Sequence, residues 1–119
     1  MLEEYKEVRQ REGEGFRRFF SNSEYDLIVW YDLSINEISG FQICYDKRLK
    51  EKVFTYKYEE GRLIKSHRIN EEWGSTITSF LNDKAGSFDS KIALQVINEL
   101  DEKETKIIQF IKDALKFCS

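Results

Sequence analysis

The chain has 119 residues, a length that suits one domain able to bury a core without disulfides or metals. Hydrophobic residues make up 40% of it and aromatic residues 14%, which excludes a disordered chain and predicts a core rich in rings. A formal net charge of -3 differs from the basic surplus of a general nucleic-acid binder, and no apolar run is long enough to span a bilayer. We therefore expect one soluble, cytoplasmic domain over residues 1–119, with no cofactor, no bound metal and no membrane partner.

The N-terminal segment has an ambiguous pattern. Apolar residues recur every three positions in residues 2–12, a spacing that fits a weak helix and a short edge strand equally. Gly13 and Gly15 then interrupt the pattern, so residues 1–15 are expected to be loosely attached to the domain.

The segment FRRFF at residues 16–20 contains the only adjacent arginines of the chain, Arg17 and Arg18. One interpretation is an anion clamp, because arginine forks match phosphate and carboxylate groups. The interpretation that we favour is a packing segment, anchored by its phenylalanines, whose arginines reach water as long cationic side chains commonly do.

Four strands are predicted in the middle of the chain. Apolar residues on both faces of the first, within DLIVWYD, indicate a strand in the interior of a sheet. Gly40 in the second marks a bulge or a close approach of two backbones. The four strands cover Leu27–Tyr31, Ile38–Tyr45, Val53–Glu59 and Arg62–Ile69, and the connections between them are short enough for hairpins.

The register of the last two strands follows from their turn. With Glu60 and Gly61 as the two turn residues, Glu59 lies opposite Arg62 and an opposite-charge pair closes the hairpin. One face is then the more aromatic, and we assign it to the core. Its pairs are Tyr58–Leu63, Tyr56–Lys65 and Phe54–His67, and the pairs of the other face are Lys57–Ile64, Thr55–Ser66 and Val53–Arg68.

Two helices are predicted at the C-terminal end. The first starts near Asp89 or Ser90, which are both good N-caps, and the second opens at Asp101 with Glu104 three residues later in a capping-box pattern. A single helix over residues 90–117 is the alternative to a break near Leu100. The predicted fold is therefore α+β: a four-stranded antiparallel β-meander followed by two C-terminal helices packed on one face. We expect Cys44 and Cys118 to be reduced thiols, with a disulfide between them as the less favoured alternative.

Parts of the predicted sheet resemble a group of small uncharacterised bacterial proteins. DLIVW at Asp26–Trp30 and GFQICYDK at Gly40–Lys47 are the most specific pieces, and the similarity extends from Arg17 to the C-terminal helices. The family has no assigned activity, so the resemblance implies no mechanism. It has two adjacent histidines where this chain has Ser66–His67, and a proline-containing segment where this chain has Thr78–Leu81. Both departures count against a shared histidine-based metal or catalytic site.

An enzymatic reading depends on His67, the only histidine of the chain. A small hydrolase-like enzyme is the alternative function, with His67, Arg68 and Asp46 as its candidate catalytic residues. A lone histidine among aromatic residues is more often packed and hydrogen-bonded, so we favour a structural role for it. Ser66 is a poor nucleophile for His67, because neighbours on a strand point to opposite faces. One histidine and two distant cysteines also predict no zinc site.

The favoured function is a non-enzymatic binding or protein-interaction domain. If the helices cover the aromatic face of the sheet, the other face is open to a partner, which is another protein or a second copy of the chain. Burial of Trp30 within one protomer would count against docking there. The candidate binding residues of this face are Trp30, Gln42, Thr55, Lys57, Ser66 and Arg68. A weak RNA- or nucleotide-binding domain is a further alternative, with a surface formed by Arg17, Arg18, Lys47 and Arg68.

Overall fold

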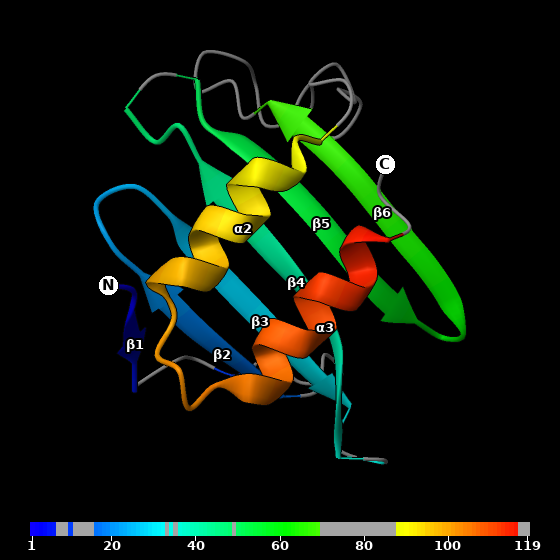
Figure 1. The fold of residues 1–119 in the computed structure, drawn as a ribbon. Helices are drawn as coiled ribbons and strands as arrows, with labels where there is room; N and C mark the ends of the chain where they lie inside the picture. Colours follow the sequence, from blue (N-terminus) through cyan, green and yellow to red (C-terminus); the bar gives the residue numbers. More distant parts are fainter. Residues whose placement is uncertain are drawn as a thin grey trace.

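The computed structural model of the protein describes residues 1–6, 10, 16–32, 34, 36–48, 50–69 and 88–116. Within them, six strands form one antiparallel sheet in the order in which they follow along the chain, and two helices lie on one of its faces (Figure 1). The strands are β1 (Glu3–Tyr5), β2 (Phe16–Ser21), β3 (Asp26–Asp32), β4 (Glu37–Tyr45), β5 (Lys52–Glu59) and β6 (Arg62–Ile69), and the helices are α2 (Ser90–Glu99) and α3 (Thr105–Leu115).

The α+β class, the antiparallel sheet and the two helices on one face are confirmed, and the sheet is larger than predicted. The four predicted strands are β3 to β6. β1 is the short edge strand that was one of the two interpretations of residues 2–12, and only β2 was not predicted. β2 was hard to predict because FRRFF does not alternate between apolar and polar residues. Arg18 lies beside Phe20 on the side of the sheet that the helices cover. That arrangement depends on carboxylates from distant segments, which a local pattern does not reveal.

The core lies between the sheet and the two helices. Alternate residues of β3 and β4 supply its centre, where Leu27, Val29, Phe41 and Ile43 have no exposed surface. The aromatic ring of Phe41 contacts those of Phe54 and Tyr56 on β5 and that of Phe110 on α3. We call this side of the sheet the helix face and the opposite side the second face.

The predicted register of the β5–β6 hairpin is confirmed at all of its pairs, from Val53 opposite Arg68 to Glu59 opposite Arg62. Glu60 and Gly61 have positive φ angles of 51° and 76°, as the turn of a two-residue hairpin requires. The aromatic side of this hairpin faces the helices, and the core assignment is confirmed for Phe54, Tyr56 and His67. It is wrong near the turn, where Tyr58, Leu63 and Lys65 are exposed.

Gly40 marks both a bulge and a close approach. The β3–β4 register shifts between Trp30 and Tyr31, beside the pair of Trp30 with Gly40. A Cβ atom on Gly40 would lie 2.6 Å from the Cα of Lys57 and 2.6 Å from the carbonyl oxygen of Tyr56. Since both are backbone atoms, the neighbouring strand could not make room for a side chain.

The break between the helices at Leu100 is confirmed, and so is the cap of α2, where Asp89 accepts a hydrogen bond from the Lys91 N–H at 2.9 Å. The capping box predicted from Asp101 to Glu104 is wrong. Asp101 accepts from the Lys103 N–H within a turn, and α3 starts only after Glu104. The Glu104 carboxylate binds an arginine of the sheet instead of a backbone N–H.

At the N-terminal end, Leu2 is buried in the core and its N–H donates to the Glu99 carbonyl of α2 at 2.8 Å. No helix among the described residues has the length and apolar character needed to cross a membrane. The expectations for residues 70–87 and for Cys118 lie outside the described residues.

Candidate functional site

His67 is packed inside the protein. It is 9% exposed, and its Nε2 lies at hydrogen-bond distance, 2.5 Å, from the Tyr45 hydroxyl. The rings of Phe54, Phe88 and Tyr45 contact the imidazole. Burial, followed by the carboxylates of Asp46 and Asp89, raises the pKa of Tyr45 to about 12, so this phenol keeps its proton at neutral pH. This setting matches the structural role that we favour for His67.

The other two candidate catalytic residues occupy different settings. Arg68 follows His67 on β6 and therefore points from the second face, opposite Val53. Asp46 lies in the β4–β5 turn with a positive φ of 55°, and its carboxylate pairs with the Lys52 Nζ at 2.7 Å. The structure thus divides the three between the core, the second face and a turn.

The second face contains the six candidate binding residues. Its centre is Trp30, which is only 8% exposed, with the Lys57 Nζ over the indole ring at 4.4 Å from the centroid. The expectation that Trp30 offers an exposed apolar contact is therefore wrong, and its burial within one protomer counts against docking on the β3 part of this face. Lys57 reaches the ring because Gly40, which lies between them in the ladder, has no side chain.

Around Trp30, the second face is polar and partly open. Thr55 is buried, and its hydroxyl donates a hydrogen bond to the side-chain oxygen Oε1 of Gln42 at 3.1 Å. The side-chain Nε2 of the same Gln42 contacts the Cys44 sulfur at 3.8 Å. Ser66 and Arg68 are half-buried, as are Gln42 and Lys57. Ile64, on the same face of β6, is 41% exposed.

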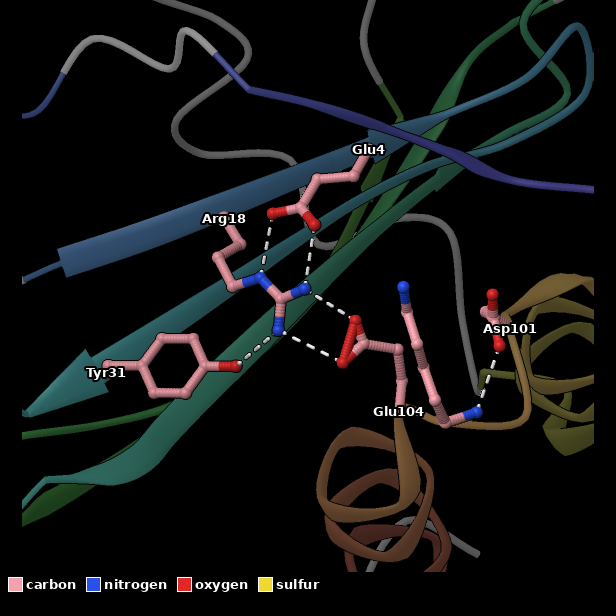
Figure 2. A network of polar contacts seen from close by, with 6 residues as sticks. Glu4, Arg18, Tyr31, Asp101 and Glu104 are labelled. Atoms are coloured by element: carbon pink, nitrogen blue, oxygen red, sulfur yellow. Dashed lines mark hydrogen bonds and ion pairs between the residues drawn. The ribbon is translucent and has the colours of Figure 1, made fainter.

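Arg18 is the centre of a polar network on the helix face (Figure 2). Its guanidinium forms two hydrogen bonds with Glu4 of β1, at 2.8 and 2.7 Å, and two with Glu104 at the start of α3, at 3.2 and 2.5 Å. It also donates to the Tyr31 hydroxyl at 3.3 Å. Hydrogen bonds from Arg18 lower the pKa of the Glu4 carboxyl. The favoured interpretation, in which the arginines reach water, is therefore wrong for Arg18. Its fork clamps two carboxylates of the chain itself, and together with the Tyr31 contact it joins β1, β2, β3 and α3.

The four cations proposed for nucleic-acid binding do not share one side of the sheet. Arg18 is on the helix face, whereas Arg17 and Arg68 belong to the second face. The backbone of Arg17 is bonded to the side-chain amide of Gln10. Lys47 lies in the β4–β5 turn and pairs with Asp26 at 2.8 Å. A continuous cationic surface from these residues is therefore disfavoured.

A group of possible metal ligands was not anticipated by the sequence analysis. The ligand atoms of Asp26, Cys44 and Glu51 lie within 4.8 Å of one another. Burial, which is the largest cause, raises the pKa of the Cys44 thiol to about 12, and Lys47 and Ser21 already hold Asp26. A metal ion would need the Cys44 thiolate, and at Asp26 it would have to compete with the Lys47 ammonium group. These residues are therefore a poor cation site at neutral pH.

A pocket of about 390 Å³ opens at one end of the sheet, between the β2–β3 turn, the β4–β5 turn and α2. Tyr25 and Tyr45 line it from the sheet, and Ile92 and Gln95 line it from α2. Sequence analysis had singled out two of its residues, Asp46 and Lys47, for other reasons. The pocket combines three separate segments, so no local motif indicates it.

Comparisons of the chain with models of known protein families, with curated proteins and with solved structures find no match. The resemblance to small bacterial proteins of unassigned activity stays a prediction.

Proposed function

We propose that the protein is a non-enzymatic domain that binds another protein through the second face of its sheet. The contact surface is the part of this face on β4–β6, here called the β4–β6 patch. Its accessible residues are Gln42, Lys57, Ile64, Ser66 and Arg68, and they surround the buried Thr55.

The observation that carries the proposal is the contrast between the two faces. Both described helices pack on the helix face, and the second face keeps polar side chains that are partly exposed. An antiparallel sheet covered on one side commonly has a solvated second side. Here that side also has an exposed isoleucine beside hydrogen-bonding groups, a mixture typical of non-obligate protein interfaces.

The charge of the patch indicates the kind of partner. Lys57 and Arg68 are its only charged residues, in a chain whose formal net charge is -3. At the hairpin end of the same face, Glu59 lies opposite Arg62, and at the far edge Asp26 pairs with Lys47. An acidic protein surface with an apolar contact for Ile64 is the complement of this patch.

Site-specific crosslinking in the cells that produce the protein tests the proposal. A benzophenone amino acid replaces Ser66 in the patch or, as the control, Leu94, which is exposed on α2. We expect a discrete protein adduct from position 66 alone, and we expect the double substitution Lys57→Glu/Arg68→Glu to abolish it. Identical adducts from both positions, or adducts that survive the double substitution, would contradict the proposal.

The same experiment separates a protein partner from the nucleic-acid alternative. An adduct at position 66 whose added mass is removed by nuclease would replace the proposed function with RNA binding. The enzymatic alternative predicts that His67, Arg68 and Asp46 act together, and their separate settings give it no support.

A further inference from the structure

We propose that the pocket at the end of the sheet binds a small zwitterion with an apolar body, of the class of free α-amino acids with apolar or aromatic side chains. This site is separate from the β4–β6 patch, so the two proposals can fail independently.

The interior of the pocket is suited to an apolar group. Tyr25 and Tyr45 are 8% and 6% exposed, and Ile92 adds an aliphatic wall from α2. The hydroxyls of both tyrosines are held within the protein, that of Tyr25 by Gln95 and that of Tyr45 by His67. A ligand would therefore meet the small exposed part of each ring together with Ile92, and the Gln95 amide N–H groups remain available as donors.

The rim of the pocket has two charges of opposite sign that are not neutralised by ion pairs. Asp46 pairs with Lys52, and Lys47 pairs with Asp26. Glu24 and Arg48 are exposed, and neither forms an ion pair with another residue of the described part of the chain. One carboxylate and one guanidinium on the same rim match a ligand that has both an ammonium group and a carboxylate.

The electrostatic surroundings place the ammonium near the tyrosines. Burial, and then the carboxylates of Glu24, Glu99 and Asp46, raise the pKa of Tyr25. A ligand cation at this end gains from the nearby Glu24 carboxylate. The Tyr45 ring offers it no free face, because the Lys52 ammonium lies over that ring and His67 stacks against it. The ligand carboxylate then faces Arg48. The volume of about 390 Å³ is at the lower end of the range of about 300–1,000 Å³ for small-molecule sites, which suits a single amino acid.

Three probes with one apolar body test the inference: phenylalanine, phenethylamine, which lacks the carboxylate, and 3-phenylpropionate, which lacks the ammonium group. Each is titrated into the ¹⁵N-labelled full chain and followed by amide chemical shifts. We expect saturable shifts confined to residues 23–25, 45–48 and 92–95, with phenylalanine binding about tenfold more tightly than either analogue.

Variants at the rim assign each charge to its partner. Arg48→Gln should make phenylalanine bind no better than phenethylamine, and Glu24→Gln should make it bind no better than 3-phenylpropionate. Lys50→Gln is the control, because Lys50 is exposed, does not line the pocket, and its loss changes the net charge as the loss of Arg48 does. The amide spectrum of each variant shows whether it is folded.

Several results would overturn the inference. The zwitterion assignment is wrong if an analogue with one charge binds as tightly as phenylalanine. The site is wrong if the shifts map to other residues. It is also wrong if no probe saturates the shifts at a ligand concentration of about 10 mM. An equal loss of affinity in Lys50→Gln and Arg48→Gln would show a general charge effect instead of a rim contact.

Discussion

The two faces of the same sheet are built on different principles. On the helix face, the central residues of β3 and β4 are completely buried and apolar, and Phe41 contacts rings from both the sheet and α3. On the second face, the adjacent residue Gln42 is half-buried and hydrogen-bonded to Thr55. Since neighbours on a strand point in opposite directions, one strand supplies stability on one side and a polar surface on the other.

Adjacent arginines on β2 show the same contrast for charged residues. Arg18 lies on the helix face because Glu4 and Glu104 satisfy its guanidinium there, and its side chain is 22% exposed. Arg17, one residue earlier, belongs to the second face opposite Trp30. A charge can therefore border the core where carboxylates from other segments surround it. Pairs of neighbouring residues offer matched substitutions that test how far the two faces differ.

The largest difference is expected between Phe41→Ala and Gln42→Ala. Removal of the Phe41 ring leaves a cavity among three other rings, so we expect a loss of about 3–5 kcal/mol in the free energy of unfolding. Gln42→Ala removes one partly exposed hydrogen bond with Thr55 and should lower the free energy of unfolding by about 1 kcal/mol. Urea denaturation followed by circular dichroism measures both. Equal losses would show that the second face also belongs to the core.

Gly40→Ala is expected to be the next most damaging change. The new methyl group would overlap two backbone atoms of β5, so the strands have to separate, at a loss of about 3 kcal/mol in unfolding free energy. Gly61→Ala is the control, because no atom lies within 4 Å of its Cβ position and only its positive φ of 76° opposes the change. A Gly40→Ala protein as stable as the native chain would show that β4 and β5 have room to move apart.

Local patterns predicted the elements whose contacts are local. The β5–β6 register follows from Glu60 and Gly61, and the start of α2 follows from Asp89, because turn and cap chemistry involve residues a few positions apart. The position of Gly40 beside another backbone was likewise visible as a glycine inside a strand.

Contacts between distant segments could not be predicted in this way. Arg18 meets Glu104 across 86 positions of sequence. That contact occupies the Glu104 carboxylate that the predicted capping box requires, and with Glu4 it holds Arg18 on the helix face. The pocket likewise combines two turns with α2. The indole of Trp30 is covered by Lys57, which lies two strands away, so the hydrophobic pattern of β3 alone could not show which residue covers it.

Arg18→Gln should destabilise the protein by about 2 kcal/mol at pH 7, because it leaves the half-buried Glu104 without its arginine. The pKa of Glu4 lies below its ordinary value of 4.5 in the folded protein, so its contribution is present above about pH 4.5 and is lost as the pH falls through the lowered pKa. We therefore expect the difference between the native chain and Arg18→Gln to shrink below pH 4.5.

Arg17→Gln is the matched control on the second face. The hydrogen bonds with Gln10 use the backbone of Arg17, so they survive the substitution, and the expected loss is below about 1 kcal/mol. Denaturation curves for both variants from pH 3 to pH 7 give the comparison. Equal losses for the two arginines, or a loss for Arg18→Gln that does not change with pH, would contradict the role assigned to the Glu4–Arg18 contact.

The smallest effect on stability is expected from Lys57→Met, which removes the cation over the Trp30 ring but keeps a flexible side chain to cover it. The loss should be about 0.5–1 kcal/mol, and Lys57→Arg should restore most of it. Trp30 emission, measured in a Trp73→Phe background, reports whether the indole becomes more exposed. Because Lys57 also belongs to the β4–β6 patch, Lys57→Met should weaken the crosslink from position 66 far more than it weakens the fold, while Phe41→Ala should weaken both together. If the second face serves binding, a substitution on it lowers the crosslink yield much more than the free energy of unfolding.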